Sequence, residues 1–412
     1  MIMAIIRPET EMKDSGVQWL GNVPKEWSVG KVKHEFYATK TIVGDKVNDY
    51  ERLALTLNGV IKRSKDAGDG LQPEKFDGYQ ILKEHELVFK LIDLANVSTS
   101  RVGLSPYTGI VSPAYIVLHH RKDMNPRYGE YYFLSMWMNE VFNHIGGDGV
   151  RSALNAKDLL NIPYLKVSSD EQQAIADYLD KTCSKIDEII AEAKASIDEY
   201  KKLKTGQINK YTIHKMKRTK LKYITEKIGD GIHATPEYSD EGTIRFINGG
   251  SFGEDSIKMI GPMLSNEEYQ KQNKSLLNEH TVMIALNGAN FGNTSLYNNE
   301  AILLGKSAGY ITLKSTVCRE YVRYCLENSV TKEAFDLSLN GTTIPNLSLN
   351  TLRNTEICLP DYSVQKQLAK TIKKMIIKMD SLIAEKESLI NDLEAYKKSL
   401  IYEVVTGKRR VV

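Results

Sequence analysis

Polar side chains that can hydrogen-bond to the edges of nucleic-acid bases recur beside glycine in this sequence. Asn and Gln can make paired contacts to adenine, and Arg and Lys can do so to guanine. Glycine next to such residues lets the backbone come close to a phosphate and supplies the positive φ of tight turns. Any one of these residues could instead cap a turn, so only their grouping is informative. The candidate contacts are Asn58, Lys62, Arg63, Lys65, Arg101 and Arg151 in the first half of the chain and His233, Arg245, Asn248, Asn287, Asn290, Asn293, Lys306 and Thr342 in the second.

The sequence contains only fragments of catalytic motifs. The tetrad NIPY from Asn161 to Tyr164 differs at its second position from the Asn-Pro-Pro-Tyr motif of adenine-N6 methyltransferases, and no glycine-rich cofactor loop accompanies it. Glu192 and Lys194 have the spacing of the end of a nuclease motif, but no Pro-Asp pair precedes them. Neither a GxxxxGK[ST] loop nor an HExxH helix occurs, and His233 has no second ligand at metal spacing. A stand-alone methyltransferase or nuclease is therefore the weaker alternative to a binding protein.

The element that organises the chain is a long helix that occurs twice. The stretch from Glu171 to Lys204 recurs 193 residues later, so that Lys185 and Asp187 correspond to Lys378 and Asp380. Apolar residues in both copies step by three and four, which predicts one apolar face along each helix and a coiled-coil pair. At 1.5 Å per residue, each copy would be a helix of roughly 50 Å. The residues predicted to pack one helix against the other are Ile175, Leu179, Ile186, Ile190, Ile197, Leu368, Ile372, Met379, Leu382, Leu389, Leu393 and Leu400.

The order of the segments predicts how the two helices run. The first helix leads from one globular domain to the next, and the second begins where the second domain ends, so the two must be antiparallel to lie along each other. The expected fold class is α+β, with two mixed α/β domains joined by the helical pair and related by internal duplication. The expected ranges are 1–166 and 213–361 for the two domains, and 167–212 and 362–412 for the helices.

Composition favours a soluble cytoplasmic protein. The 412 residues are 42% hydrophobic and 26% charged, no apolar run approaches the length of a membrane span, and the N-terminal residues lack the pattern of a signal peptide. The four cysteines are far apart, which argues against a zinc site or a disulfide framework. Residues 201–222 contain nine Lys or Arg and no acidic residue, a strip that is either a solvated face or a contact to phosphates.

Several motifs together resemble the DNA-specificity subunit of type I restriction-modification systems. They are GVQWLGNVPKEW near the start, GGDGVRSALNAKDLLNIP and NGTTIPNLSLNTLRN before the two helices, the loop GDGIHATPEY and the helices themselves. The resemblance runs from Ser15 to Lys408 in the order recognition domain, helix, recognition domain, helix. It implies that each domain reads one half of a bipartite site in double-stranded DNA and that the helices set the spacing.

The same resemblance implies the partners of the chain. Two modification subunits would bind S-adenosylmethionine and transfer the methyl group, and restriction subunits would use ATP to translocate and cleave DNA. The chain itself would hold no cofactor or metal and catalyse nothing. The remaining alternative is a coiled-coil scaffold that does not bind DNA, and salt distinguishes the two, because DNA affinity falls steeply with ionic strength.

Overall fold

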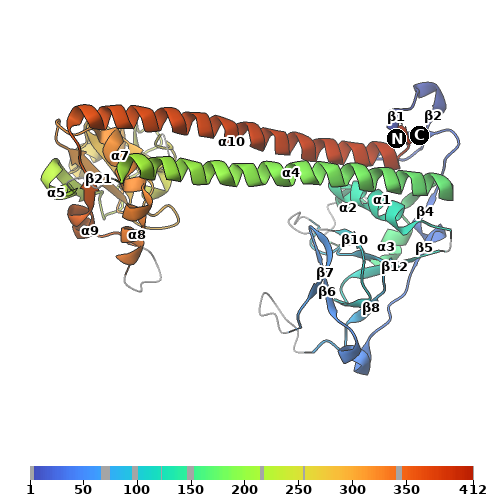
Figure 1. The fold of residues 1–412 in the computed structure, drawn as a ribbon. Helices are drawn as coiled ribbons and strands as arrows, with labels where there is room; N and C mark the ends of the chain where they lie inside the picture. Colours follow the sequence, from blue (N-terminus) through green and yellow to red (C-terminus); the bar gives the residue numbers. More distant parts are fainter. Residues whose placement is uncertain are drawn as a thin grey trace. The chain divides into compact units, whose positions relative to one another are not determined.

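The computed structural model describes residues 4–65, 75–94, 101–121, 123–145, 153–213, 218–253, 256–339 and 346–411. The chain forms two compact units. The first unit comprises Met1–Glu192 and Ser388–Val412, and the second comprises Ala193–Glu387. Two long helices, α4 (Ser169–Thr212) and α10 (Tyr362–Val405), each contribute one part to each unit, and within a unit the two parts lie side by side (Figure 1).

Each long helix contains 44 residues, about four times the usual length of a helix in a globular protein. Neither could bury a stripe of that length alone. The stripes are buried by the other long helix and, at the start of α10, also by the globular core of the second unit. In α4 the buried positions advance by three and four through Gln172, Ala176, Leu179, Cys183, Ile186, Ile190, Ala193 and Ile197. In α10 the buried residues Gln365, Ala369, Ile372, Ile376 and Ile390 lie 193 positions after residues of that set.

Two ion pairs between the helices show that they are antiparallel. In the second unit the Nζ of Lys204 lies 2.9 Å from Asp380 Oδ1, and in the first unit the Nζ of Lys397 lies 2.7 Å from Asp187 Oδ2. Adding 193 to Lys204 gives Lys397, and adding it to Asp187 gives Asp380. The duplication therefore extends to individual contacts, and the predicted fold class of a mixed α and β protein with two long antiparallel helices is confirmed.

Most of the predicted packing residues lie on the paired faces. All five residues predicted in α4 are buried, as are Ile372 and Leu400 in α10, while Leu368, Met379, Leu382 and Leu393 are partly buried. Leu389 was predicted wrongly, because its side chain is 37% exposed and its neighbour Ile390 is buried in its place. The regular advance by three and four from Gln365 reaches position 390, so Leu389 falls on the flank of the stripe.

The helix α10 also ends earlier than the range 362–412. After Val405 the chain turns at Gly407, whose φ is +73°, and continues as strand β23 (Arg409–Val411). A Cβ at Gly407 would lie 2.4 Å from the ring of Pro24, so both the backbone angle and the close contact require glycine. Strand β23 pairs with β1 (Ala4–Ile6), which brings the two ends of the chain together in the first unit (Figure 1).

The globular part of the first unit contains two four-stranded sheets, in the orders β10-β9-β12-β5 and β7-β6-β11-β8. Rings of Phe36, Phe89, Phe133 and Tyr164 meet edge to face between the first sheet and α1. Its strands are β2 (Met12–Asp14), β3 (Asn22–Pro24), β4 (Ser28–Lys31), β5 (Phe36–Ala38), β6 (Arg52–Thr56), β7 (Gly59–Arg63), β8 (Gln80–Leu82), β9 (Leu87–Phe89), β10 (Val102–Leu104), β11 (Gly109–Val111), β12 (Ile116–His120) and β13 (Pro163–Lys166), and its helices are α1 (Pro126–Met138), α2 (Val141–His144) and α3 (Ala156–Leu160).

The second unit repeats this plan, with sheets in the orders β15-β21-β18-β19 and β17-β16-β20. Its core lies between the first of these sheets, helix α7 and the start of α10. Its strands are β14 (Arg218–Lys220), β15 (Thr225–Asp230), β16 (Ile244–Ile247), β17 (Met263–Leu264), β18 (Thr281–Ala285), β19 (Thr294–Leu296), β20 (Ile302–Leu304), β21 (Ala308–Leu313) and β22 (Glu356–Cys358), and its helices are α5 (Leu221–Ile224), α6 (Asn266–Gln272), α7 (Arg319–Glu327), α8 (Ser329–Leu337) and α9 (Leu349–Asn354).

The two units share strand order although their sequences differ between the repeated motifs. Strand β12 pairs antiparallel with β9 and β5, as β21 does with β18 and β15. In the second sheets, β11 pairs parallel with β6, as β20 does with β16. The duplication therefore covers the whole domain fold as well as the helices, and the loops are where the two units differ.

The register of the helix pair predicts which alanine substitutions in α10 lower the free energy of unfolding. Ile390→Ala should lower the free energy of unfolding by about 2–5 kcal/mol, because the buried side chain leaves a cavity. Leu389→Ala, on the same helix but more than a third exposed, should change it by no more than about 0.5 kcal/mol. Urea unfolding followed by circular dichroism compares the two, and equal losses would contradict the assigned register.

Candidate nucleic-acid interface

In the first unit, the β6–β7 hairpin presents several of the predicted residues. Asn58 is exposed at its tip, where its backbone N–H donates to Thr56 Oγ1 over 3.2 Å and the following Gly59 has a φ of +86°. The side chain of Asn58 is left at the surface, because the turn is closed by the backbone and by Thr56. The side-chain amide of Asn58 is therefore exposed at the turn between two paired strands.

Basic residues gather in a cleft of about 470 Å³ beside this hairpin. Lys62, Arg63 and Lys65 line it together with Arg52, which is directly opposite Arg63 in the strand register. Asp49 and Glu51 line the same cleft. Internal partners reduce the positive charge of the cleft, since Lys62 Nζ lies 2.5 Å from Glu51 Oε2 and Lys65 Nζ donates to the carbonyl of Val47 over 2.6 Å. The structure therefore brings three predicted contacts together.

Arg101 was predicted to contact nucleic acid at the surface, but it is buried. Its side chain is buried, and its guanidinium donates to the carbonyls of Ile92 over 2.9 Å and Asp93 over 2.6 Å. Burial also lowers the pKa of this guanidinium. Arg101 holds the backbone beside β9 and β10 and does not face solvent, so the prediction of a nucleic-acid contact is corrected. Arg151 and Thr342 lie outside the described residues.

In the second unit, the loops that follow β16, β18 and β20 meet at Ser307. Its Oγ accepts a hydrogen bond from the N–H of Gly249 over 2.9 Å and donates to Asn248 Oδ1 over 3.2 Å, and its carbonyl accepts from the N–H of Leu286. Asn290 Nδ2 donates to the carbonyl of Gly250 over 3.0 Å. The predicted residues Asn248, Asn290 and Lys306 therefore belong to one group of loops, which we call the Ser307 cluster (residues 229–233, 248–251, 287–293 and 305–307).

Glycine in the Ser307 cluster serves loop packing. A Cβ at Gly305 would lie 2.3 Å from Asn248 Oδ1, and one at Gly231 would lie 2.1 Å from the carbonyl oxygen of Leu304. We expected these glycines to let the backbone approach a phosphate. In the structure, Gly305 and Gly231 instead let neighbouring loops of the protein approach each other. Gly288 is different, because its φ is +81° and the space around it is open.

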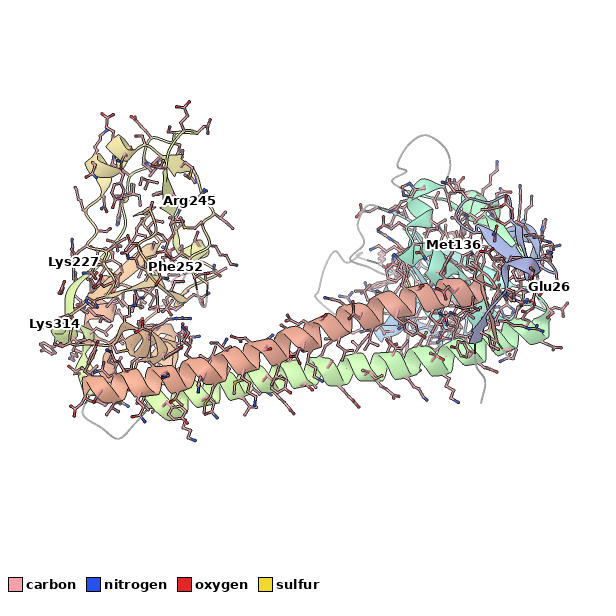
Figure 2. The ribbon with its side chains drawn as sticks, turned by 90° about the horizontal axis from the view of Figure 1, so that it is seen from above. Glu26, Met136, Lys227, Arg245, Phe252 and Lys314 are labelled. Atoms are coloured by element: carbon pink, nitrogen blue, oxygen red, sulfur yellow. The ribbon has the colours of Figure 1, made fainter. Side chains whose placement is uncertain are left out.

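The other predicted residues of the second unit differ in exposure and in contacts. His233 is exposed with Nε2 2.8 Å from Asp230 Oδ2, and Arg245 is partly buried with its guanidinium on the carbonyl of Gly261. Arg245 and Phe252 lie in the sheet-containing part of the unit, apart from the long helices (Figure 2). Asn287 bridges to Asn346 through the backbone. Asn293 is exposed on a cavity of about 370 Å³ that Lys201 and Lys204 also line.

The sequence interpretation missed a histidine–carboxylate pair in the first unit. His119 Nδ1 lies 2.5 Å from Glu86 Oε1, its Nε2 lies 2.8 Å from Thr39 Oγ1, and its ring stacks on Tyr37 with centroids 5.0 Å apart. The hydrogen bond to Glu86 raises the pKa of His119. Burial opposes ionisation of Glu86, but its hydrogen bonds to His119 and to the N–H of Lys83 lower its pKa. Nothing in the spacing of residues 86 and 119 indicated that cross-strand pair.

The chemistry of these surfaces is that of binding. They offer amide groups, ammonium and guanidinium groups on loops held by rigid sheets, which suits hydrogen bonds to bases and ion pairs to phosphates. Among the described residues, no three His, Cys, Asp or Glu side chains are grouped as metal ligands would be. No helix in the described part of the chain has the length and apolar character to cross a bilayer.

Comparisons with known proteins agree with this geometry. Residues 204–392 match the family described as the type I restriction modification DNA specificity domain. The fold is similar to that of a chain described under the structural basis of complex assembly and conformational transition of the type I R-M system. The TM-score is 0.75 and the sequence identity is 13%, and the match covers 94% of this chain and 99% of that one. It is also similar, with a TM-score of 0.54 and 12% identity, to the HsdS subunit from Thermoanaerobacter tengcongensis, covering 94% and 98%.

The pair of His119 and Glu86 predicts a pH dependence of stability. The raised pKa of His119 gives stabilisation that is fully present below about 6.5 and is lost as the pH rises through its folded value. The lowered pKa of Glu86 gives stabilisation that is present above about 4.5 and is lost in more acidic solution. The pair therefore stabilises most between these values.

We expect His119→Gln to lower the midpoint of thermal unfolding at pH 6 by several degrees, and by less at pH 8.5, where the wild-type imidazole is less protonated. A loss of 1 kcal/mol corresponds to roughly 2–4 °C for a unit of this size. His120→Gln, one residue along the same strand, is the control for loss of an imidazole. If His119→Gln lowered the midpoint equally at both pH values, the charged pair would not be the cause.

Proposed function

Because residues 204–392 match the family described as the type I restriction modification DNA specificity domain, we propose that the chain is the DNA specificity subunit of such a system. In this role the globular part of each unit reads one half of a bipartite site in double-stranded DNA. The two long helices set the spacing between the halves and carry the docking sites for methyltransferase subunits. The site of action is the cytoplasm, where the DNA is.

The observation that carries this proposal is a repeated fold with different loops. Both units have the same strand order in the first sheet, and their second sheets share three strands in the same order. On this shared scaffold the first unit presents Lys62, Arg63 and Lys65 beside a hairpin, whereas the second presents the asparagine-rich Ser307 cluster. Two domains with the same fold but different loop side chains could each recognise a different half of an asymmetric, two-part DNA site.

Base reading and phosphate contact are divided between different side chains. Asn58, Asn248 and Asn290 have the amide groups that can pair with adenine edges, and Arg63 has the fork that fits guanine. Lysines such as Lys62 and Lys306 supply phosphate contacts, which position the protein but carry little sequence information. Lys62 must exchange its carboxylate partner Glu51 for a phosphate, so its contribution is expected to fall with added salt.

The chain is proposed to recognise DNA without acting on it. Its sequence has neither a glycine-rich cofactor loop after a strand nor a nucleotide-binding loop, and its exposed loops carry amide and basic groups. Methyl transfer would then belong to two modification subunits that bind S-adenosylmethionine, and ATP-driven translocation and cleavage to restriction subunits. The similar chain from a study of type I R-M complex assembly supports partners of this kind.

Exchange of one recognition part tests the proposal. We expect a chimera in which residues 218–350 come from another family member to change one half of the methylated site and leave the other half unchanged, because the reading loops of the second unit lie in that range. The readout is sequencing of methylated DNA after reaction with the modification subunits. A matched sample without those subunits should show no methylation. Alteration of both halves by the chimera would contradict independent reading.

Lengthening both helices tests their role in spacing. Four residues inserted after Ser196 and four after Leu389, which correspond by the offset of 193, should add roughly 6 Å to each helix while keeping the apolar stripes nearly in phase. Both half-site sequences should persist, and the preferred spacer should grow by about one or two base pairs. The measurement is methylation of duplexes that differ only in spacer length. An active variant with an unchanged preference would show that the helices do not measure the distance.

A further inference from the structure

Two glutamines are buried at equivalent places at the start of the long helices. Gln172 is in the first turn of α4 and is 4% exposed, and Gln365 is in the first turn of α10 and is 2% exposed. They are related by the offset of 193 residues. Burying an amide side chain is unfavourable unless both its N–H donor and its oxygen acceptor form hydrogen bonds. The hydrogen-bond partners of the two glutamines therefore indicate what the glutamines do.

Gln172 joins three elements of the first unit. Its Nε2 donates to the carbonyl of Val167, just before α4, over 2.8 Å, and its Oε1 accepts from the backbone N–H of Asn125 over 2.9 Å. Asn125 is the N-cap residue of α1, and its own side chain accepts from the N–H groups of Arg127 and Tyr128. One amide therefore fixes the start of the domain helix α1 against the first turn of α4.

Gln365 makes the same two contacts in the second unit. Its Nε2 donates to the carbonyl of Pro360 over 2.7 Å, and its Oε1 accepts from the backbone N–H of Cys318 over 2.9 Å. Cys318 is the N-cap residue of α7, the counterpart of α1. Adding 193 to Val167 and Asn125 gives Pro360 and Cys318, so the contacts are repeated although the contacted residue types have changed.

The contacts require a glutamine because one neighbour is a donor and the other an acceptor. Both neighbours are main-chain groups, so their geometry survives changes of side chain. An apolar residue of similar size would leave a buried N–H and a buried C=O without these partners, which is unfavourable. A carboxylate could accept from the N–H but could not donate to the carbonyl.

We propose that Gln172 and Gln365 are positioning residues that hold each DNA-reading domain at a defined orientation on the first turn of its own long helix. This inference rests on the proposed function. The reading loops can select bases only if the domain that carries them is held at a constant angle to its helix. Each glutamine therefore controls the accuracy with which its own half-site is read.

The test uses the complete complex with modification subunits and compares Gln172→Met with Gln365→Met. The rate of methylation is measured on the cognate duplex and on duplexes with one base changed in either half. Gln172→Met should lower discrimination at the half-site of the first unit by about tenfold, the effect of roughly 1.4 kcal/mol, and leave the other half-site unchanged. Gln365→Met should do the reverse. Gln367→Met, at an exposed position two residues further along α10, is the control and should discriminate normally.

A second variant separates positioning from general damage. In Gln172→Glu, the ionised carboxylate cannot donate to Val167, whereas the protonated acid both donates and accepts as glutamine does. Burial raises the pKa of such a carboxyl group. DNA binding by this variant should therefore regain discrimination at pH 6 relative to pH 8, while wild type shows no such gain.

Each outcome has one meaning. Equal loss of discrimination at both half-sites, or unchanged discrimination in all three buried-site variants, would overturn the positioning role. If Gln172→Met does not fold, the pH comparison of Gln172→Glu decides instead. A wild-type complex that methylates without sequence preference would overturn the proposed function itself, and that result is seen before any variant is made.

Discussion

The mutual burial of two apolar stripes is the constraint on which the rest of the structure depends. A helix of 44 residues exposes a stripe that no single small core can cover, so α4 and α10 must pair within each unit. The side chains of Ile197 and Ile390, equivalent positions in the two helices, are buried as a result. The ion pairs of Lys204 with Asp380 and Lys397 with Asp187 then fix the direction and register of the pairing.

Duplication explains how one scaffold can carry two readers. Main-chain features have been kept in both copies, namely the strand order of the first sheet and the contacts of the buried glutamines. Loop side chains have not been kept, since one unit has a cleft lined by lysine and arginine and the other has the asparagine-rich Ser307 cluster. Because main-chain groups make the repeated contacts, the side chains of the loops can differ without loss of the fold. Sequence recognition would reside in these loops.

Periodic features could be predicted from the sequence, and contacts between distant residues could not. Steps of three and four identified the helices and their pairing, but Leu389 and Ile390 are both apolar and only the register of the partner decides which is buried. Arg101 looked like a surface contact, because a sequence does not show which carbonyls lie around a guanidinium. His119 and Glu86 are 33 residues apart and meet only through strand pairing.

The central claim is that this chain reads a two-part DNA site with two different domains of one fold. The most direct measurement is sequencing of DNA methylation across the genome in cells that contain the chain and in matched cells that lack it. The account predicts that one class of methylated sites disappears with the chain, and that these sites share two unlike specific halves separated by a spacer of constant length and free sequence. Loss of a single uninterrupted motif, or no loss at all, would contradict it.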